Sequence, residues 1–321
     1  MAQRTAAWSV RALLAACLLL TAEILLWTAP TRALADWPSL VAGYLALAAL
    51  TLDLAQRWRA RDLFGLLLLA GLLAAVGSAA LFPQRALADL PLTLVTRAMG
   101  AYALGFALAL ALGVKLLGGP HRRLLAAILV GGLAWGVWAR GLPSLTDAVE
   151  TAPVSLLLAG TVALALIGVA RWLVGRARAH LSAADLRLDR ISGALVLAAL
   201  VWSLLRAHDS GALGSLALTA CAALAVYCLL LLWFQQRGRA LTPLEAALPA
   251  GPAAWSWLAG GAALFLLGGL VGYSLPAGGS GLDAAGLLAL VFTAYGLVWL
   301  PTVSLVLGVK GWRRLTRQRR L

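Results

Sequence analysis

The sequence predicts an all-α fold: a polytopic transmembrane helical bundle of about ten spans, with the N-terminus and the C-terminus both cytoplasmic. Three observations predict it: an apolar composition, ten separate apolar runs, and basic residues that recur at every second loop. Hydrophobic residues make up 62% of the 321 residues and charged residues 12%, whereas soluble domains average roughly 45–50% and 25%. Because one span takes about 20 apolar residues, ten spans fill residues 1–321 as a single integral membrane domain.

The apolar runs follow one another at short intervals and are rich in Leu, Ala, Gly and Val. The seventh is the shortest. Ten spans can also divide into two halves of five, at 1–140 and 151–321, and an odd number of spans per half inverts one half relative to the other, as in many secondary transporters. The runs cover residues 9–29, 38–55, 63–82, 91–114, 124–139, 153–170, 191–205, 212–234, 255–275 and 284–309.

Basic residues alternate between the two sides of this arrangement. With the N-terminus inside, 21 of the 26 Lys and Arg residues fall on the cytoplasmic side, and the outer loops carry only Arg32, Arg85, Arg140 and Arg206. This is the positive-inside pattern, and it predicts a multi-pass protein of the cell (inner) membrane. The net charge of +14 then indicates orientation and attraction to anionic lipids at the cytoplasmic face rather than a nucleic-acid partner.

The first run also resembles a signal peptide, because Arg4 and Arg11 lie at its N-terminal end and the cleavage-like stretch 33–35 follows it. Its length and the presence of Glu23 favour a first span that is retained. Two inner loops contain capping-box patterns, Ser182 with Asp185 and Thr242 with Glu245, which predict short helices at the membrane surface.

Two charged residues fall well inside the predicted spans, away from their ends. Glu23 lies six residues before the outer end of the first run, and Arg97 lies six residues after the outer start of the fourth. At 1.5 Å per residue, both would lie about 9 Å below the outer surface. An ionisable residue in the hydrocarbon layer usually has a partner or faces a cavity. Equal depth and opposite charge therefore predict a Glu23–Arg97 pair, which is either an anion or proton site or a structural ion pair; the remaining alternative is an Arg97 that extends outward to the membrane surface.

Three further features bear on the helices. Pro301 lies well inside the last run, where it frees a backbone carbonyl and marks a possible hinge or ion path. Small residues form two G-x-x-x-G patterns, Gly132 with Gly136 and Gly268 with Gly272, and we expect them to pack helices within the bundle. Near the inner surface, Asp53 has Arg57 one turn further on, which predicts an ordinary i,i+4 ion pair.

Residues that would define a cofactor or a catalytic centre are sparse. The three histidines lie at or near predicted loops, and the three cysteines lie inside apolar runs without thiol–metal spacing. We therefore predict no metal, no cofactor and no catalytic residues, and the sequence favours a protein that is not an enzyme.

Three classes of function fit these observations. A permease or transporter of a small solute or lipid-linked intermediate fits the span count and the Glu23–Arg97 pair. The layout of ten spans with both ends inside resembles that of the drug/metabolite transporter group, although no sequence motif of that group is present. The alternatives are a non-catalytic accessory or scaffold subunit of a membrane complex and an integral membrane enzyme that acts on lipid. A polar cavity at Glu23 and Arg97 would favour transport, whereas a dry salt bridge would weaken it.

Overall fold

The computed structural model describes residues 2–27, 33–60, 62–118, 122–145, 152–177, 181–235, 242–247, 255–275 and 284–318, and all regular structure in these ranges is helical. Ten helices in them are long and apolar enough to cross a membrane, so the ten predicted runs are confirmed as helices. The seventh, Arg190–Asp209, has 20 residues and is long enough for a bilayer about 30 Å thick.

Eight of the ten candidate spans are single α-helices, and two combine an α-helix with a π-helical segment. The composite spans are the first, α1 (Ala2–Leu19) with η1 (Leu20–Leu25), and the fourth, η3 (Leu94–Tyr102) with α5 (Ala103–Leu117). The single helices are α2 (Trp37–Arg57), α3 (Leu63–Ala80), α6 (Arg122–Leu145), α7 (Pro153–Ala177), α8 (Arg190–Asp209), α9 (Ser215–Gln235), α11 (Trp255–Ser274) and α12 (Ala284–Gln318).

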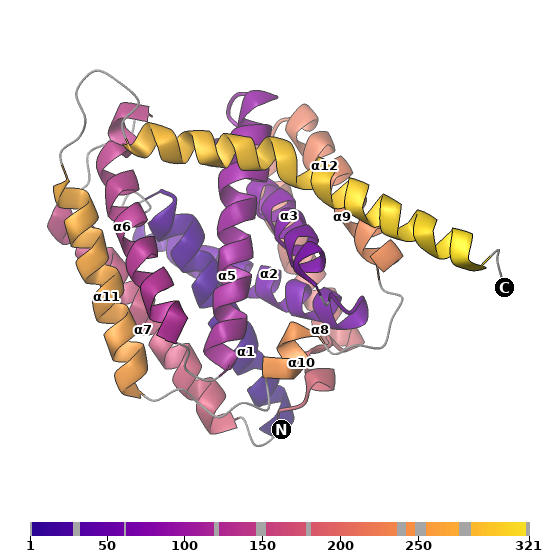
Figure 1. The fold of residues 1–321 in the computed structure, drawn as a ribbon, viewed down its shortest axis with the longest axis horizontal. Coiled ribbons are helices and arrows are strands. Elements are labelled where there is room, and N and C mark those ends of the chain that lie inside the picture. Colours follow the sequence, from indigo (N-terminus) through magenta and orange to yellow (C-terminus); the bar gives the residue numbers. More distant parts are fainter. Residues whose placement is uncertain are drawn as a thin grey trace.

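The first four spans form the centre of the bundle, and the other six surround them (Figure 1). Between 56% and 78% of the most apolar window of each of the first four is buried, against 11–28% in the remaining six. The outer helices follow a simple order: α7 packs on α1, α8 on α2 and α9 on α3. The helices α6 and α11 pair beside α7, and α12 packs across η3.

Glycines set the closest helix contact, between α6 and α11. A Cβ atom on Gly136 would clash with the carbonyl oxygen of Gly269, and one on Gly272 would clash with the carbonyl oxygen of Leu133. The two G-x-x-x-G patterns therefore face each other, because only glycine lets the two backbones approach so closely. The expectation that they pack helices within the bundle is confirmed.

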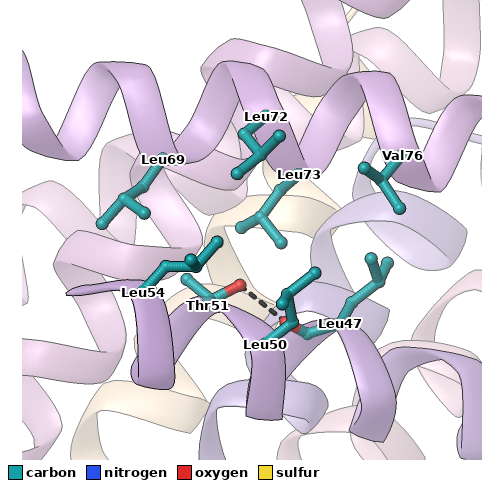
Figure 2. A pocket seen from close by; sticks show the side chains of 8 residues that line it. All are labelled: Leu47, Leu50, Thr51, Leu54, Leu69, Leu72, Leu73 and Val76. Carbon is teal, nitrogen blue, oxygen red and sulfur yellow. Dashed lines mark hydrogen bonds between the residues drawn. The ribbon is translucent and has the colours of Figure 1, made fainter. Parts of the chain in front are cut away.

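The central helices α2 and α3 meet through a leucine-rich crevice that has no room for a water-sized sphere. Figure 2 shows its lining, with Leu47, Leu50 and Leu54 from α2 opposite Leu69 and other residues of α3. The Thr51 hydroxyl donates to the carbonyl of Leu47 over 2.6 Å. Its polar hydrogen is therefore used within α2, and the crevice is dry core rather than a ligand site.

The two ends of the bundle are named here after the buried carboxylate at each, the Glu23 end and the Asp53 end. Both capping boxes lie at the Asp53 end. Ser182 and Asp185 cap the short helix η5 (Ala183–Leu186), and Thr242 and Glu245 cap α10 (Pro243–Ala247). The two predicted short helices are thus present, and their place at a membrane surface stays a prediction.

Asp53 fastens the loop before α8 to the centre of the bundle. Its carboxylate accepts from the backbone N–H of Leu188 at 2.7 Å and from Arg57 Nε at 2.7 Å, so the predicted i,i+4 ion pair is present. Arg11, which is 4% exposed, donates to the carbonyl oxygens of Leu186 and Arg187 at 3.4 Å each. These charges hold a loop against α1 and α2, which is a structural role.

Candidate functional site

The two charged residues that the sequence places inside spans both lie on π-helical segments. Glu23 belongs to η1, at the end of the first span, and Arg97 belongs to η3, at the start of the fourth. A π-helical segment has an i→i+5 register, is rare, and is frequently found at functional sites. Glu23 lies two residues from the end of its span and Arg97 three residues from the start, so both lie nearer the helix ends than the sequence predicted.

Glu23 is almost completely buried, with 1% of its surface exposed. One carboxylate oxygen accepts from the Tyr44 hydroxyl at 3.0 Å, and the other accepts from Arg85 Nη1 at 2.9 Å. Tyr44 lies on α2, and Arg85 lies on the short helix α4 (Pro83–Ala86) after α3. Three separate elements thus supply the salt bridge and the hydrogen bond that keep a charge in the interior.

Arg97 extends this arrangement without touching the carboxylate. Its Nη1 donates to the backbone carbonyl of Arg85 at 2.8 Å, and its guanidinium lies 5.3 Å from the centre of the Trp27 ring. The predicted direct pair of Glu23 with Arg97 is therefore wrong: the salt bridge joins Glu23 to Arg85. The physical reason is the loop after α3, whose short helix brings the Arg85 guanidinium to Glu23 and the Arg85 backbone carbonyl to Arg97.

Glu23, Tyr44, Arg85 and Arg97 are called the charged cluster below. Aromatic rings lie next to it. Tyr102 is fully buried and stacks on Phe82, with ring centroids 4.1 Å apart, and Trp27 and Phe106 lie 6.2 Å and 6.1 Å from Tyr102. A guanidinium over an indole face is stabilised by the quadrupole of the ring. The rings thus give Arg97 an apolar, rigid support.

Three tryptophans fix the backbone of the two π-helical regions. Trp135 and Trp138 of α6 donate to the carbonyl oxygens of Ile24 and Leu26 at 2.9 Å and 2.6 Å. Trp299 of α12 donates to the carbonyl oxygen of Met99 at 2.9 Å. A changed helical register alters which backbone carbonyls are hydrogen-bonded within the helix. The indole N–H of tryptophan can only donate a hydrogen bond, so it suits a carbonyl that lacks a donor in its own helix. The indoles therefore hold both segments in place from neighbouring helices.

Pro301 is not part of the charged cluster. The helix α12 continues through it, and its side chain is exposed. Trp299 and Val303, which are 4% and 1% exposed, lie on the buried face of the same helix. At 100° per residue, that face points away from Pro301. A role for Pro301 in a substrate path therefore stays a prediction that this arrangement does not favour.

Sequence reasoning missed Arg85, which it placed among the basic residues of the outer loops. Two signals point to it in retrospect. The positive-inside pattern does not account for an arginine in an outer loop, so a local interaction is expected for Arg85. Pro83, two residues earlier, favours the start of a helix. The partner of Glu23 could not be chosen from depth alone. Another outer-loop arginine, Arg32, lies outside the described residues.

The arrangement presents two guanidiniums and one carboxylate at one end of the bundle. In the part of the chain that the structure describes, the Arg97 guanidinium makes no salt bridge, and its partners are a carbonyl and a ring. Guanidinium groups recognise carboxylates and phosphates through paired N–H donors. Among the described residues, no three His, Cys, Asp or Glu side chains group so as to hold a metal ion. The chemistry available is anion binding.

No family model, curated protein or solved structure matches this chain.

Proposed function

We propose that the protein is an inner-membrane permease that carries a small anionic solute or a lipid-linked anionic intermediate. One observation carries the proposal. Two spans change their helical register at the same end of the bundle, and each carries its charged residue on the changed segment. Transporters place substrate sites where spans are interrupted, and intramembrane ionisable residues usually mark such sites.

The roles of the residues follow from their surroundings. Arg97 is half-buried and makes no salt bridge in the described part of the chain, so it is the group that binds an incoming anion. Arg85 is 23% exposed at its side chain and already holds Glu23, so it positions the site. Glu23 is buried in a salt bridge, which is the outcome that weakens a transport role for this carboxylate. We therefore assign Glu23 the task of holding Arg85 rather than of binding cargo.

Several helix contacts support two inverted halves of five spans, whereas the contacts of α1 with α2 and of α3 with α5 have no equally extensive counterpart between α7 and α8 or between α9 and α11. A two-fold axis that exchanges each span with the span five later pairs the first with the sixth, the second with the seventh and the third with the eighth. These pairs are α1 with α7, α2 with α8 and α3 with α9, and all three are in contact. The same axis relates the contact of the fourth and tenth spans, η3 with α12, to that of the ninth and fifth, α11 with α6. It also relates the contact of the first and fourth spans, α1 with α5, to that of the sixth and ninth, α7 with α11. All four contacts occur.

In this proposal the Asp53 end faces the cytoplasm and the Glu23 end faces outward. The positive-inside pattern supports the orientation, because the Asp53 end receives most of the basic loops. The charged cluster then lies near the outer surface, where an anion would enter or leave.

The first test is anion binding by the purified chain in phosphatidylcholine nanodiscs. Inorganic phosphate and succinate are titrated while the melting temperature is measured, and we expect one of them to stabilise the wild type. Arg97→Gln should weaken that anion about ten-fold, since a hydrogen bond to a charged group contributes about 1.5–3 kcal/mol. Arg206→Gln removes an exposed arginine from the same end and should leave binding unchanged.

Uptake of the stabilising anion into proteoliposomes then separates transport from binding alone. Uptake by the wild type that falls with Arg97→Gln supports a permease. If neither anion shifts the melting temperature, or if both arginine variants behave alike, the anion site is rejected. Binding without uptake, together with a co-purifying protein, would favour the accessory-subunit alternative, and turnover of a lipid would favour the enzyme alternative.

A further inference from the structure

A lateral groove of about 540 Å³ lies at the Asp53 end, between α1 and α7, with one residue of α2 beside it. The α1 wall consists of Thr5, Trp8, Ser9 and Ala12, which have the i, i+3, i+4, i+7 spacing of a single helical face. The remaining lining residues are Leu45 of α2 and Leu173, Arg176 and Ala177 of α7. The groove is therefore apolar along most of its length and polar at one end.

The groove opens on a surface that faces hydrocarbon in a bilayer. An apolar stripe of α7 runs along this surface, with Val162, Leu166, Val169 and Leu173 exposed by 53%, 46%, 55% and 41%. Leu173 belongs both to this stripe and to the groove lining. Since the stripe is covered by acyl chains when α7 spans a membrane, a chain can pass from the bilayer into the groove without crossing polar surface.

The polar end of the groove lies at headgroup depth. Arg176 is one residue from the end of its span, and Thr5 is two residues from the start of the first. The Arg176 guanidinium lies 4.6 Å from the centre of the exposed Trp172 ring, and the described residues provide no carboxylate for it. A stacked guanidinium keeps its N–H edge available for a phosphate, and tryptophan prefers the membrane interface.

We propose that this groove is a binding site for an anionic phospholipid, with one acyl chain in the groove and the phosphate on Arg176. The shape matches a chain, the uncompensated charge matches an acidic headgroup, and the order of apolar and polar parts matches the direction of a lipid in that leaflet. The site is distinct from the charged cluster, which lies at the other end of the bundle. It also goes beyond the general attraction of basic loops to anionic lipid, because it assigns one lipid to one groove.

Three variants of the full chain test this assignment by native mass spectrometry. Delipidated protein is mixed with phosphatidylglycerol and phosphatidylcholine of identical chains, and the bound lipid is counted at each concentration. The wild type should retain phosphatidylglycerol in preference. Arg176→Gln should weaken it about five-fold, the order of one basic residue's attraction to an anionic surface. Ala12→Phe, which fills the groove without changing charge, should lower the binding of both lipids.

Arg123→Gln is the matched control, because Arg123 is an exposed arginine at the same end that does not line the groove. An equal loss with Arg123→Gln and Arg176→Gln would overturn the site and leave only diffuse attraction. Unchanged lipid binding by a folded Ala12→Phe variant would also overturn it. If Ala12→Phe does not fold, the comparison of the two arginine variants still decides the question.

Discussion

At the scale of single residues, the cost of burying Glu23 explains its surroundings. A carboxylate buried inside a helical bundle loses its hydration and is stabilised only by opposite charge and hydrogen bonds. Tyr44 and Arg85 provide one contact to each oxygen. The salt bridge is therefore part of the fold at this end of the bundle, and removing one partner takes a stabilising contact from the other.

Glu23→Gln should lower the free energy of unfolding by about 2 kcal/mol, less than the 3–5 kcal/mol of a fully buried pair because Arg85 is partly exposed. Arg85→Gln should cost more than that, because Glu23 is the more deeply buried of the two residues and loses its contact with the Arg85 guanidinium. The double variant should lose less than the two single losses added together, since each single variant already loses the interaction between Glu23 and Arg85. Denaturant unfolding of all four proteins in mixed micelles measures this coupling. Additive losses would show that Glu23 and Arg85 do not interact.

Tyr44→Phe is the control for the hydrogen bond. It removes one donor to Glu23 and leaves both charges in place, so it should cost about 1 kcal/mol. A loss as large as that of Arg85→Gln would mean that the hydroxyl, rather than the guanidinium, stabilises the carboxylate.

At the scale of helices, close packing depends on glycines that a sequence can locate but cannot pair. The spacing of Gly132, Gly136, Gly268 and Gly272 predicts faces of small residues. It does not say which helices these faces join, because a G-x-x-x-G face serves equally within one chain or between two. The structure joins α6 to α11 through them.

Gly136→Ala should destabilise the bundle by about 1–3 kcal/mol, the usual cost of overpacking. The added methyl group would clash with the backbone of α11 at Gly269 and Tyr273, and backbone atoms cannot move as a side chain can. Gly131→Ala is the matched control on the same helix, because no atom lies within 4 Å of a Cβ at this position. The control should be neutral or slightly stabilising, since alanine favours a helix. Equal melting temperatures for the two variants would contradict the α6–α11 contact.

The charged cluster shows where sequence reasoning ends. Hydropathy and loop charge predict the helices, and depth indicates that Glu23 and Arg97 lie at one end of the bundle. The partner of Glu23 depends on how a loop of a few residues folds back after α3, and that is a tertiary property. The register change at Glu23 and Arg97 was equally hidden. Its backbone is held by Trp135, Trp138 and Trp299, which come from spans distant in sequence.

At the scale of the whole molecule, the first four spans form a core, and the later spans pack around it. Because α8 packs on the outside of this core, its most apolar segment is the least buried of the ten candidate spans, at 11%. In water such a helix would expose most of its apolar surface, whereas in a bilayer the same surface faces acyl chains. The proposed topology therefore depends on α8 crossing the membrane, because without it every later helix would reverse its direction.

Two single cysteines on either side of α8 test this. The three native cysteines, Cys17, Cys221 and Cys228, are at most 3% exposed, so they give a low background with a membrane-impermeant maleimide. Ala184→Cys and Ser210→Cys place an exposed thiol before and after the helix. With the Asp53 end in the cytoplasm, intact cells should label Ser210→Cys, and Ala184→Cys should react only after permeabilisation. The reverse result would invert the proposed orientation. Labelling of both from one side would show that α8 lies along the membrane, so that α9, α11 and α12 run opposite to the directions proposed here.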